Sequence, residues 1–169
     1  MNIVLIGYRG TGKTSVGKLL ARKLNRKMLS TDKMIVKKAD ISINKIVKKY
    51  GWEKFRYLES KAIKSINGLD GFVIDAGGGV ILKNENIKSL KKNGIIVLLR
   101  ANPKVIVSRI KNSKKRPSLT NKTFIEEINH VLKRRKRKYN KAADFVVDTT
   151  ISNIEQVCNE IIKKLNNKV

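Results

Sequence analysis

The sequence predicts an α/β fold in which a parallel sheet is covered by helices on both faces. Four short apolar runs rich in β-branched residues are typical of buried parallel strands, at residues 3–6, 72–76, 95–99 and 145–147. Stretches with helical periodicity separate these runs, and strands that alternate with helices form a parallel sheet between two helical layers. The 169 residues fit a single domain, 1–169.

The helices are placed by apolar residues that recur every three to four positions. They cover residues 16–24, 43–50, 55–66, 87–90, 105–110, 124–139 and 154–165. A weaker apolar run at 27–29 is a candidate fifth strand. Asn102 followed by Pro103 is typical of a helix start, and Asn93 followed by Gly94 of a helix stop.

The formal net charge of the chain is +26. Three explanations stay open: a lysine-rich composition with no role of its own, attraction of small anions, and a nucleic-acid footprint. Lysines fall between apolar positions throughout the helices, which is typical of a solvated face. Aromatic residues do not interleave with the basic ones as they do on single-strand binding surfaces, so nucleic acid is not the expected partner.

Apolar runs are too short to span a membrane, and the first residues lack the basic region and cleavage site of a signal peptide. We therefore expect a cytoplasmic protein that does not bind membranes and acts as a monomer. Cys158 lies on a helical apolar stripe, which favours a buried structural thiol. His130 has no cluster of metal-ligating residues near it in the sequence and is interpreted as a solvated or packed side chain.

The segment "GYRGTGKT" at residues 7–14 lies between the first apolar run and a helical stretch. It fits the pattern G-x-x-x-x-G-K-[S/T] of a phosphate-binding loop, in the strand, loop and helix context that the pattern requires. Glycines let backbone amides close around phosphate oxygens, and the positive end of the following helix adds to that field. The residues expected to bind a nucleoside triphosphate are Gly10, Thr11, Gly12, Lys13, Thr14 and Ser15.

Two side chains of this loop have distinct predicted roles. Lys13 supplies a mobile full charge for the β- and γ-phosphates, and the Thr14 hydroxyl is placed to ligate Mg²⁺. The sequence therefore predicts a bound nucleoside triphosphate together with Mg²⁺.

A polar, strongly basic loop, "KNSKKRPSLTNK" at residues 111–122, is long for a connection inside a compact domain. One interpretation is a mobile surface loop. The other is a lid, spanning about 111–123, that closes over anions. The phosphate-binding loop elsewhere in the chain favours the lid.

Arg135 lies on the apolar stripe of the helix expected at 124–139, three residues after Leu132 and four before Tyr139. A guanidinium on a buried face needs an anion or a cleft. The alternative is an arginine whose charged end reaches the surface along its own stem.

Arg56 lies three residues before Glu59 in the helix expected at 55–66, so the two side chains are able to interact, and a plain surface ion pair is the alternative to a functional role. Two arginines form a planar, bidentate clamp for a carboxylate, a task that lysine performs poorly. Arg56 and Arg135 together would form such a clamp for a substrate carboxylate.

Three consecutive glycines, Gly77, Gly78 and Gly79, follow the third apolar run. They are expected at the carboxyl edge of the sheet, where open α/β sheets bind ligands. Missing side chains let a substrate approach, and the backbone N–H groups are able to hold its oxygens. A tight turn without ligand contact is the alternative.

Five segments taken in order resemble the shikimate kinase family through nearly the whole chain. The resemblance is carried by "NIVLIGYRGTGKTSVGKLLARKL" at the start, "FRYLE" at 55–59, "GGGV" at 77–80, "RPSL" at 116–119 and "RKRKYNKAAD" at 135–144. It implies a fold similar to nucleoside monophosphate kinases: a three-layer P-loop kinase domain with a five-stranded parallel sheet, a substrate-binding insertion at about 31–62 and a lid. The implied reaction is transfer of the ATP γ-phosphoryl group to the 3-hydroxyl of shikimate, a step of aromatic amino-acid synthesis through chorismate.

The resemblance also implies residue roles. Asp32 matches the aspartate that contacts the acceptor hydroxyl, where it accepts a proton or orients the hydroxyl, whereas the residue pattern alone also allows a simple helix cap. Arg116 in the lid is expected to neutralise charge on the transferred phosphates. Arg109 matches an arginine near the adenine. Gly78 and Gly79, with Arg56 and Arg135, complete the implied acceptor site.

Three positions depart from the family pattern. Ser30 stands where the family has the first aspartate of Asp-x-Asp, and Asp75 is a candidate to serve the metal instead. The lid reads "RPSL" rather than R-P-L-L, and the adenine-side loop "DTTISN" lacks an arginine. Two other functions were weighed: a kinase for another small acceptor such as gluconate or a nucleoside monophosphate, and a nucleotide-gated nucleic-acid-binding protein.

Overall fold

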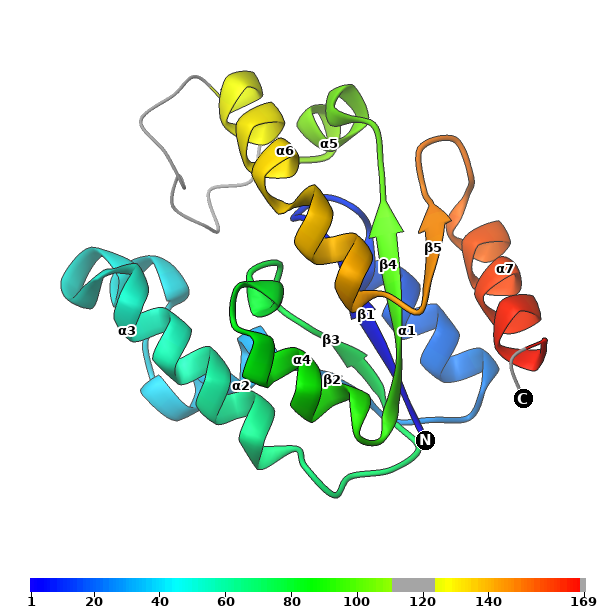
Figure 1. Ribbon diagram of the computed structural model, residues 1–169, viewed down its shortest axis with the longest axis horizontal. Helices are drawn as coiled ribbons and strands as arrows, with labels where there is room; N and C mark the ends of the chain where they lie inside the picture. Colours follow the sequence, from blue (N-terminus) through cyan, green and yellow to red (C-terminus); the bar gives the residue numbers. More distant parts are fainter. Residues whose placement is uncertain (111–123, 168–169) are drawn as a thin grey trace.

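The computed structural model describes residues 1–110 and 124–167. Five parallel strands form one sheet in the order β2-β3-β1-β4-β5 (Figure 1). The strands are β1 (Asn2–Ile6), β2 (Met28–Ser30), β3 (Val73–Asp75), β4 (Gly94–Arg100) and β5 (Phe145–Asp148). The predicted α/β fold with a five-stranded parallel sheet is confirmed, and the weak apolar run at 27–29 corresponds to β2.

The helices follow the strands in alternation. They are α1 (Lys13–Lys23), α2 (Thr31–Ala39), α3 (Ile43–Ser65), α4 (Asn84–Lys91), α5 (Pro103–Ile110), α6 (Phe124–Ala142) and α7 (Ile154–Asn166), with a short 3-10 helix η1 (Val80–Leu82). The Asn102 side chain accepts a hydrogen bond of 2.9 Å from the Lys104 N–H, which confirms the predicted start of α5. The predicted stop at Asn93-Gly94 lies too late, because α4 ends at Lys91 and Gly94 already begins β4.

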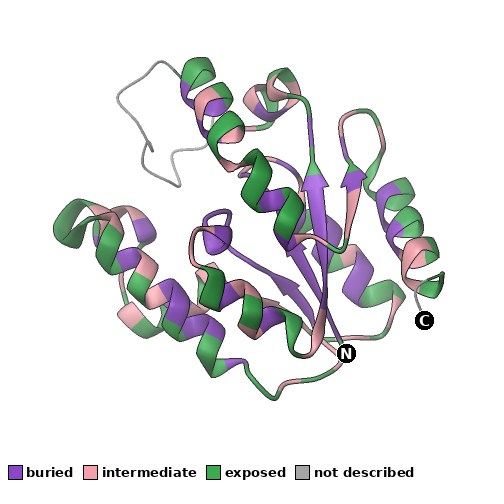
Figure 2. Cartoon of the chain, viewed as in Figure 1, coloured by how far each residue is buried: buried purple, intermediate pink, exposed green. Residues whose placement is uncertain are grey.

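The central strand β1 divides the core into two layers because successive side chains point to opposite faces. Val4 and Ile6 pack with residues of α3, α4 and α6, whereas Ile3 and Leu5 pack with residues of α1 and α7. Both faces of the sheet are therefore covered, as Figure 2 shows by the buried strands between helices whose outer faces are exposed.

The segment between β2 and β3 holds α2 and α3, which pack on one another around their own apolar cluster. The sequence predicted two separate helices at 43–50 and 55–66. The structure joins them in α3, and Gly51, with φ of 76°, forms a kink between the two arms. The left-handed backbone at Gly51 interrupts the periodicity that the sequence shows. Periodicity did not predict helix α2, although the cap alternative for Asp32 implied a helix start there.

Helix α7 covers the face of the sheet opposite α6. Cys158 is fully buried, and this burial raises the pKa of its thiol. The position of Cys158 therefore agrees with the prediction of a buried structural thiol. Ile154, which begins the helical stretch predicted at 154–165, is 45% exposed in the first turn of α7, where it lines a pocket.

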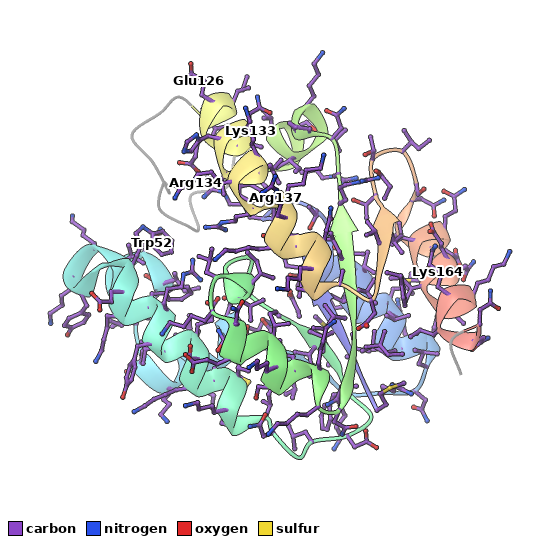
Figure 3. All side chains as sticks on the ribbon, in the orientation of Figure 1. Trp52, Glu126, Lys133, Arg134, Arg137 and Lys164 are labelled. Carbon is purple, nitrogen blue, oxygen red and sulfur yellow. The ribbon has the colours of Figure 1, made fainter. Side chains whose placement is uncertain are left out.

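Basic side chains project from the outer faces of several helices, and Lys133, Arg134 and Arg137 on α6 are labelled examples in Figure 3. All three are exposed. Within the described residues, the helices lack the combination of length and apolar character that crossing a bilayer requires.

Candidate active site

The phosphate-binding loop, residues 7–14, joins the carboxyl end of β1 to the first turn of α1. Gly7 has φ of 143°, and a Cβ atom there would lie 2.3 Å from the carbonyl oxygen of Leu99. Gly12 has φ of 90° and caps the amino end of α1. An L side chain is strained at either position, so the loop needs glycine for its own backbone path.

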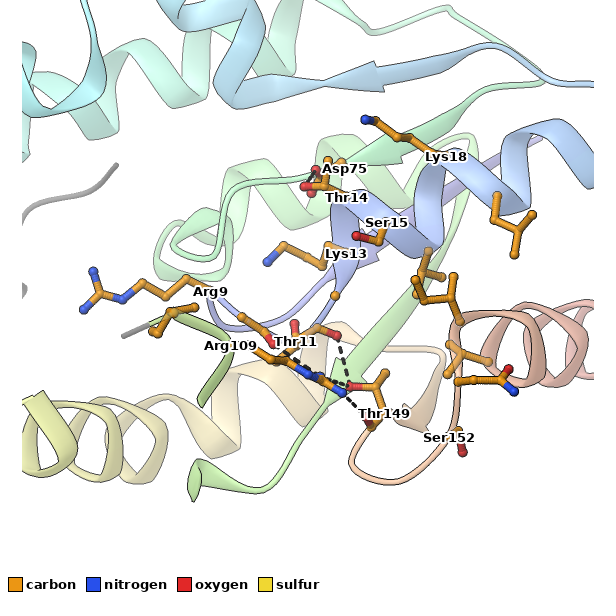
Figure 4. Close-up of a pocket in the computed structure, with 18 of the residues that line it drawn as sticks. Arg9, Thr11, Lys13, Thr14, Ser15, Lys18, Asp75, Arg109, Thr149 and Ser152 are labelled. Carbon is orange, nitrogen blue, oxygen red and sulfur yellow. Dashed lines mark hydrogen bonds between the residues drawn. The ribbon is translucent and has the colours of Figure 1, made fainter. Parts of the chain in front are cut away.

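Lys13 lies buried across the inside of this loop. Its Nζ donates hydrogen bonds to the carbonyl oxygens of Gly7, at 2.9 Å, and Tyr8, at 3.1 Å. The Thr11 hydroxyl donates to the same Tyr8 oxygen over 2.8 Å. Lys13 also lines the large pocket shown in Figure 4, so its positive charge lies at the wall of that pocket.

Thr14 and Asp75 connect α1 to the end of β3. The Thr14 hydroxyl donates a hydrogen bond of 2.6 Å to Oδ2 of Asp75. A hydroxyl and a carboxylate oxygen are ligands that Mg²⁺ prefers, and Mg²⁺ at a phosphate site takes few protein ligands because phosphates and waters complete its shell. This donor set therefore fits Mg²⁺. In the described part of the chain no cluster of three or more His, Cys, Asp or Glu side chains forms another metal site.

The large pocket has a volume of about 1400 Å³ and opens in front of the phosphate-binding loop (Figure 4). The six loop residues predicted to bind nucleotide, from Gly10 to Ser15, line it, and so do the predicted Arg109 and the two carboxylates Asp32 and Asp75. Lys18 and Arg22, from the next turns of α1, add two cations to its wall. A pocket with this loop and this charge is suited to a nucleoside triphosphate.

Arg109 is held at the wall of the large pocket by Thr149, which the sequence analysis did not identify. Its guanidinium donates to the Thr149 hydroxyl at 3.1 Å, to the Thr149 carbonyl at 2.7 Å and to the Gly10 carbonyl at 3.3 Å. The Thr149 hydroxyl in turn donates to the Thr11 carbonyl over 3.1 Å. Thr149 thus ties α5 to the phosphate-binding loop, and a lone threonine after a strand carries no sequence signal for that.

A second, smaller pocket lies between α3, α6 and the glycine turn after β3. Its lining includes three arginines and one carboxylate: Arg9, Arg56, Arg135 and Glu59. The excess of guanidinium groups suits a small anionic ligand. Arg9 lines both this pocket and the larger one, so the two pockets meet beside the phosphate-binding loop.

Each glycine of the turn 77–79 lies against a different neighbour. A Cβ atom on Gly79 would lie 2.0 Å from the Arg56 guanidinium, and one on Gly78 would lie 3.0 Å from the Gly7 carbonyl. A Cβ on Gly77 would meet Oε1 of Glu59 at 2.6 Å and Oδ1 of Asp32 at 3.0 Å. A side chain at any of the three positions would therefore crowd a neighbour within the protein, apart from any role of the glycines in holding a substrate.

Arg56 and Glu59 form a buried ion pair, which overturns the surface alternative. Nη1 of Arg56 donates to Oε2 of Glu59 over 2.7 Å, and only 1% of the Glu59 side chain is exposed. Burial raises the pKa of Glu59, and the charge of Arg56 partly opposes that effect. The Arg56 guanidinium also lies over the rings of Trp52 and Phe55, with its Cζ 5.3 and 5.0 Å from their centroids.

Arg135 turns inward from α6, so the alternative of a surface-reaching side chain is wrong. Its Nη1 donates to the Gly78 carbonyl over 3.2 Å. The Tyr139 hydroxyl donates to the same oxygen over 2.5 Å. Arg56 and Arg135 therefore approach neighbouring glycines of one turn from different helices.

Asp32 lies in the first turn of α2 and lines the larger pocket next to the glycine turn. It is not the cap of α2, because the Ser30 side chain takes that place and accepts from the Lys33 N–H. The helix-cap alternative for Asp32 is therefore wrong.

A buried network at the amino end of α6 was not anticipated. Arg9 forms an ion pair with Glu127, whose side chain is 2% exposed, and the Tyr8 hydroxyl donates to the same carboxylate over 3.4 Å. The Arg9 guanidinium also lies over the Tyr8 and Phe124 rings. This network anchors α6 to the phosphate-binding loop.

Arg116, with the whole lid expected at 111–123, lies outside the described residues.

The parallel sheet, the phosphate-binding loop that follows β1 and the adjoining arginine-lined pocket define the class: a P-loop kinase of small molecules. A model of the shikimate kinase family matches residues 9–166. The chain belongs to the shikimate kinase family.

Individual relatives agree with this family. The shikimate kinase of Thermodesulfovibrio yellowstonii is 45% identical over 163 residues, covering 96% of this chain and 94% of that protein. The shikimate kinase of Geobacter sulfurreducens is 41% identical over 160 residues, covering 95% of this chain and 88% of that protein. The structure of Acinetobacter baumannii shikimate kinase in complex with shikimate aligns with a TM-score of 0.94 at 29% identity, covering 99% of this chain and 93% of that one.

A deoxyadenosine kinase from M. mycoides with bound dATP aligns more distantly, with a TM-score of 0.64 at 19% identity over 98% of this chain and all of that one. At that identity the likeness shows the shared fold alone.

Proposed function

We propose that this chain transfers the γ-phosphoryl group of ATP to the 3-hydroxyl of shikimate. The observation that carries the proposal is the pairing of Arg56 and Arg135 at the glycine turn, beside the phosphate-binding loop. Two guanidinium groups in one small pocket suit a small carboxylic acid, and relatives at 40–45% identity over nearly the whole chain are shikimate kinases.

ATP occupies the larger pocket in this proposal, with its phosphates on residues 10–15. The backbone amides of the loop and the charge of Lys13 hold the β- and γ-phosphates, and Arg109 lies toward the adenine. Thr14 and Asp75 would hold Mg²⁺, which supplies charge neutralisation at the β- and γ-phosphate oxygens when it is bound.

Shikimate occupies the smaller pocket, with its carboxylate on Arg56 and Arg135. Its hydroxyl then points toward Asp32, which lies where the two pockets approach the glycine turn. The hydroxyl oxygen forms a bond to the γ-phosphorus while the bond to the β-phosphate oxygen breaks and ADP leaves. Asp32 orients the hydroxyl and accepts its proton, whereas most of the rate gain comes from position and charge.

Four expectations from the sequence stay predictions. Arg116 is proposed to neutralise charge on the transferred group. The protein is proposed to be cytoplasmic, to act as a monomer and to have no nucleic-acid partner.

The test is an acceptor comparison with the purified full chain, ATP and Mg²⁺. ADP release is measured with shikimate, gluconate and AMP side by side, and the products are identified by mass. We expect turnover with shikimate and a mass gain of one phosphoryl group. Turnover with gluconate or AMP but not with shikimate would overturn the proposal.

A further inference from the structure

The carbonyl oxygen of Gly78 is the meeting point of two donors from α6. Tyr139 donates over 2.5 Å and Arg135 over 3.2 Å. A carbonyl oxygen has two lone pairs, so one peptide accommodates both hydrogen bonds. The two donors lie one helical turn apart on the same face of α6, which is the spacing that lets both reach one acceptor.

The Tyr139 hydroxyl keeps both its proton and its direction, so it acts as a constant hydrogen-bond donor. Tyr139 is 4% exposed and packs in the core layer beneath α6. Burial raises its pKa to about 12, so the phenol keeps its proton throughout the neutral and mildly alkaline range. Its ring is enclosed by buried apolar side chains, which restrict the direction in which the hydroxyl points.

The orientation of the Gly78 carbonyl also determines the direction of the Gly79 N–H. The Gly78 carbonyl and the Gly79 N–H belong to one planar trans peptide and point in opposite directions. Gly79 lines the smaller pocket and lies against the Arg56 guanidinium. Glycines have no side chain to restrict such a peptide, so a run of three depends on outside contacts for its orientation.

We propose that Tyr139 is a positioning residue for the acceptor: its hydroxyl fixes the Gly78–Gly79 peptide and, through the shared carbonyl, the guanidinium of Arg135. Tyr139 itself does not touch the acceptor. This role rests on the proposed function, because it assigns the acceptor to the pocket that Gly79, Arg56 and Arg135 line.

The test is Tyr139→Phe, which removes one oxygen atom and keeps the ring. The KM for shikimate is expected to rise about 2- to 10-fold, the usual effect of one neutral hydrogen bond. The KM for ATP is expected to stay within about 2-fold, because the nucleotide pocket does not include Tyr139. Tyr57→Phe is the matched control, since Tyr57 is exposed on α3 and both constants should remain unchanged.

A double-mutant cycle separates positioning from a purely structural role. If Tyr139 acts through the shared carbonyl, Tyr139→Phe should raise the KM for shikimate less in an Arg135→Ala background than in the wild type. A structural residue would instead lower the melting temperature and leave both KM values as they were.

Each remaining outcome has a defined meaning. An unchanged KM for shikimate in Tyr139→Phe, an equal rise in the KM for ATP, or a variant that does not fold would overturn the positioning role. None of these results would affect the proposed function, because the wild type would still phosphorylate shikimate. A wild type that does not phosphorylate shikimate would instead overturn the proposed function, and this inference with it.

Discussion

Ser30 lies opposite Asp75 in the register of β2 and β3, so the two side chains belong to neighbouring strand ends. The family resemblance places an aspartate at position 30, whereas Ser30 here caps α2. Asp75 carries the carboxylate at this edge of the sheet and accepts the hydrogen bond of Thr14. The proposed Mg²⁺ site therefore has the carboxylate of Asp75 at the end of β3, but it lacks the carboxylate that the family pattern has at position 30.

This arrangement predicts opposite effects at the two positions. Asp75→Asn should raise the Mg²⁺ concentration for half-maximal activity about tenfold or more, because a ligating carboxylate is lost. Ser30→Asp should lower it, since a second carboxylate is added and aspartate still caps the helix. Ser42→Asp is the matched control, because Ser42 caps α3 and does not line the nucleotide pocket. An unchanged Mg²⁺ requirement in Asp75→Asn would contradict the assignment.

Asp32→Asn should lower kcat about 100-fold or more, because a positioned base contributes at least that much to proton transfer. The fold should be unaffected, since Ser30 rather than Asp32 caps α2. Steady-state kinetics with saturating ATP and shikimate measure the change. Asp40→Asn, the same substitution at the left-handed carboxyl end of α2, serves as control. Near-wild-type turnover in Asp32→Asn would remove Asp32 from the role of base.

Glu59→Gln should weaken shikimate binding and destabilise the fold by about 1–2 kcal/mol, because the partly buried Arg56 loses its counter-charge while a hydrogen-bond acceptor remains. Urea unfolding and the KM for shikimate report the two effects. The exposed Glu53 lies on the same helix, and Glu53→Gln should change neither. A Glu59→Gln variant as stable as the wild type would show that the ion pair contributes little.

The raised pKa of Tyr139 predicts a pH-dependent loss of stability. The phenol titrates near 10 when unfolded and at about 12 when folded, so between these values the folded state holds more protons and the unfolding free energy falls as pH rises. Tyr139→Phe lacks this contribution. The wild type should therefore lose about 1 kcal/mol more than the variant between pH 9 and pH 11, as measured by urea unfolding. Parallel pH profiles would contradict the buried titration.

The strands and the phosphate-binding loop could be predicted because their signals are local. Buried parallel strands are continuous apolar runs, and the loop has a fixed spacing of glycines and lysine. Periodicity missed helix α2 because its three large apolar residues form one short run, 34–36, with charged residues on both sides. The kink at Gly51 and the exposure of Ile154 depend on where each helix meets its neighbours, which periodicity does not report.

The site was predictable to a similar extent. Arg135 was recognised as a possible clamp residue because a guanidinium in an apolar stripe is unusual, and Arg56 because "FRYLE" resembles a segment of the family. The Arg9–Glu127 pair joins residues 118 positions apart, and the hydrogen bond of Tyr139 to Gly78 spans 61. Such partners are brought together only by the packing of α6 on the carboxyl edge of the sheet, so the sequence alone carries no sign of them.

The central claim is that Arg56 and Arg135 together hold the acceptor carboxylate. Titration calorimetry of shikimate with Arg56→Lys, Arg135→Lys and the exposed control Arg137→Lys tests it most directly. We predict that each of the first two variants binds shikimate at least about tenfold more weakly, because lysine cannot reproduce a bidentate contact, and that Arg137→Lys binds as the wild type does. Wild-type affinity in both Arg56→Lys and Arg135→Lys would contradict the claim.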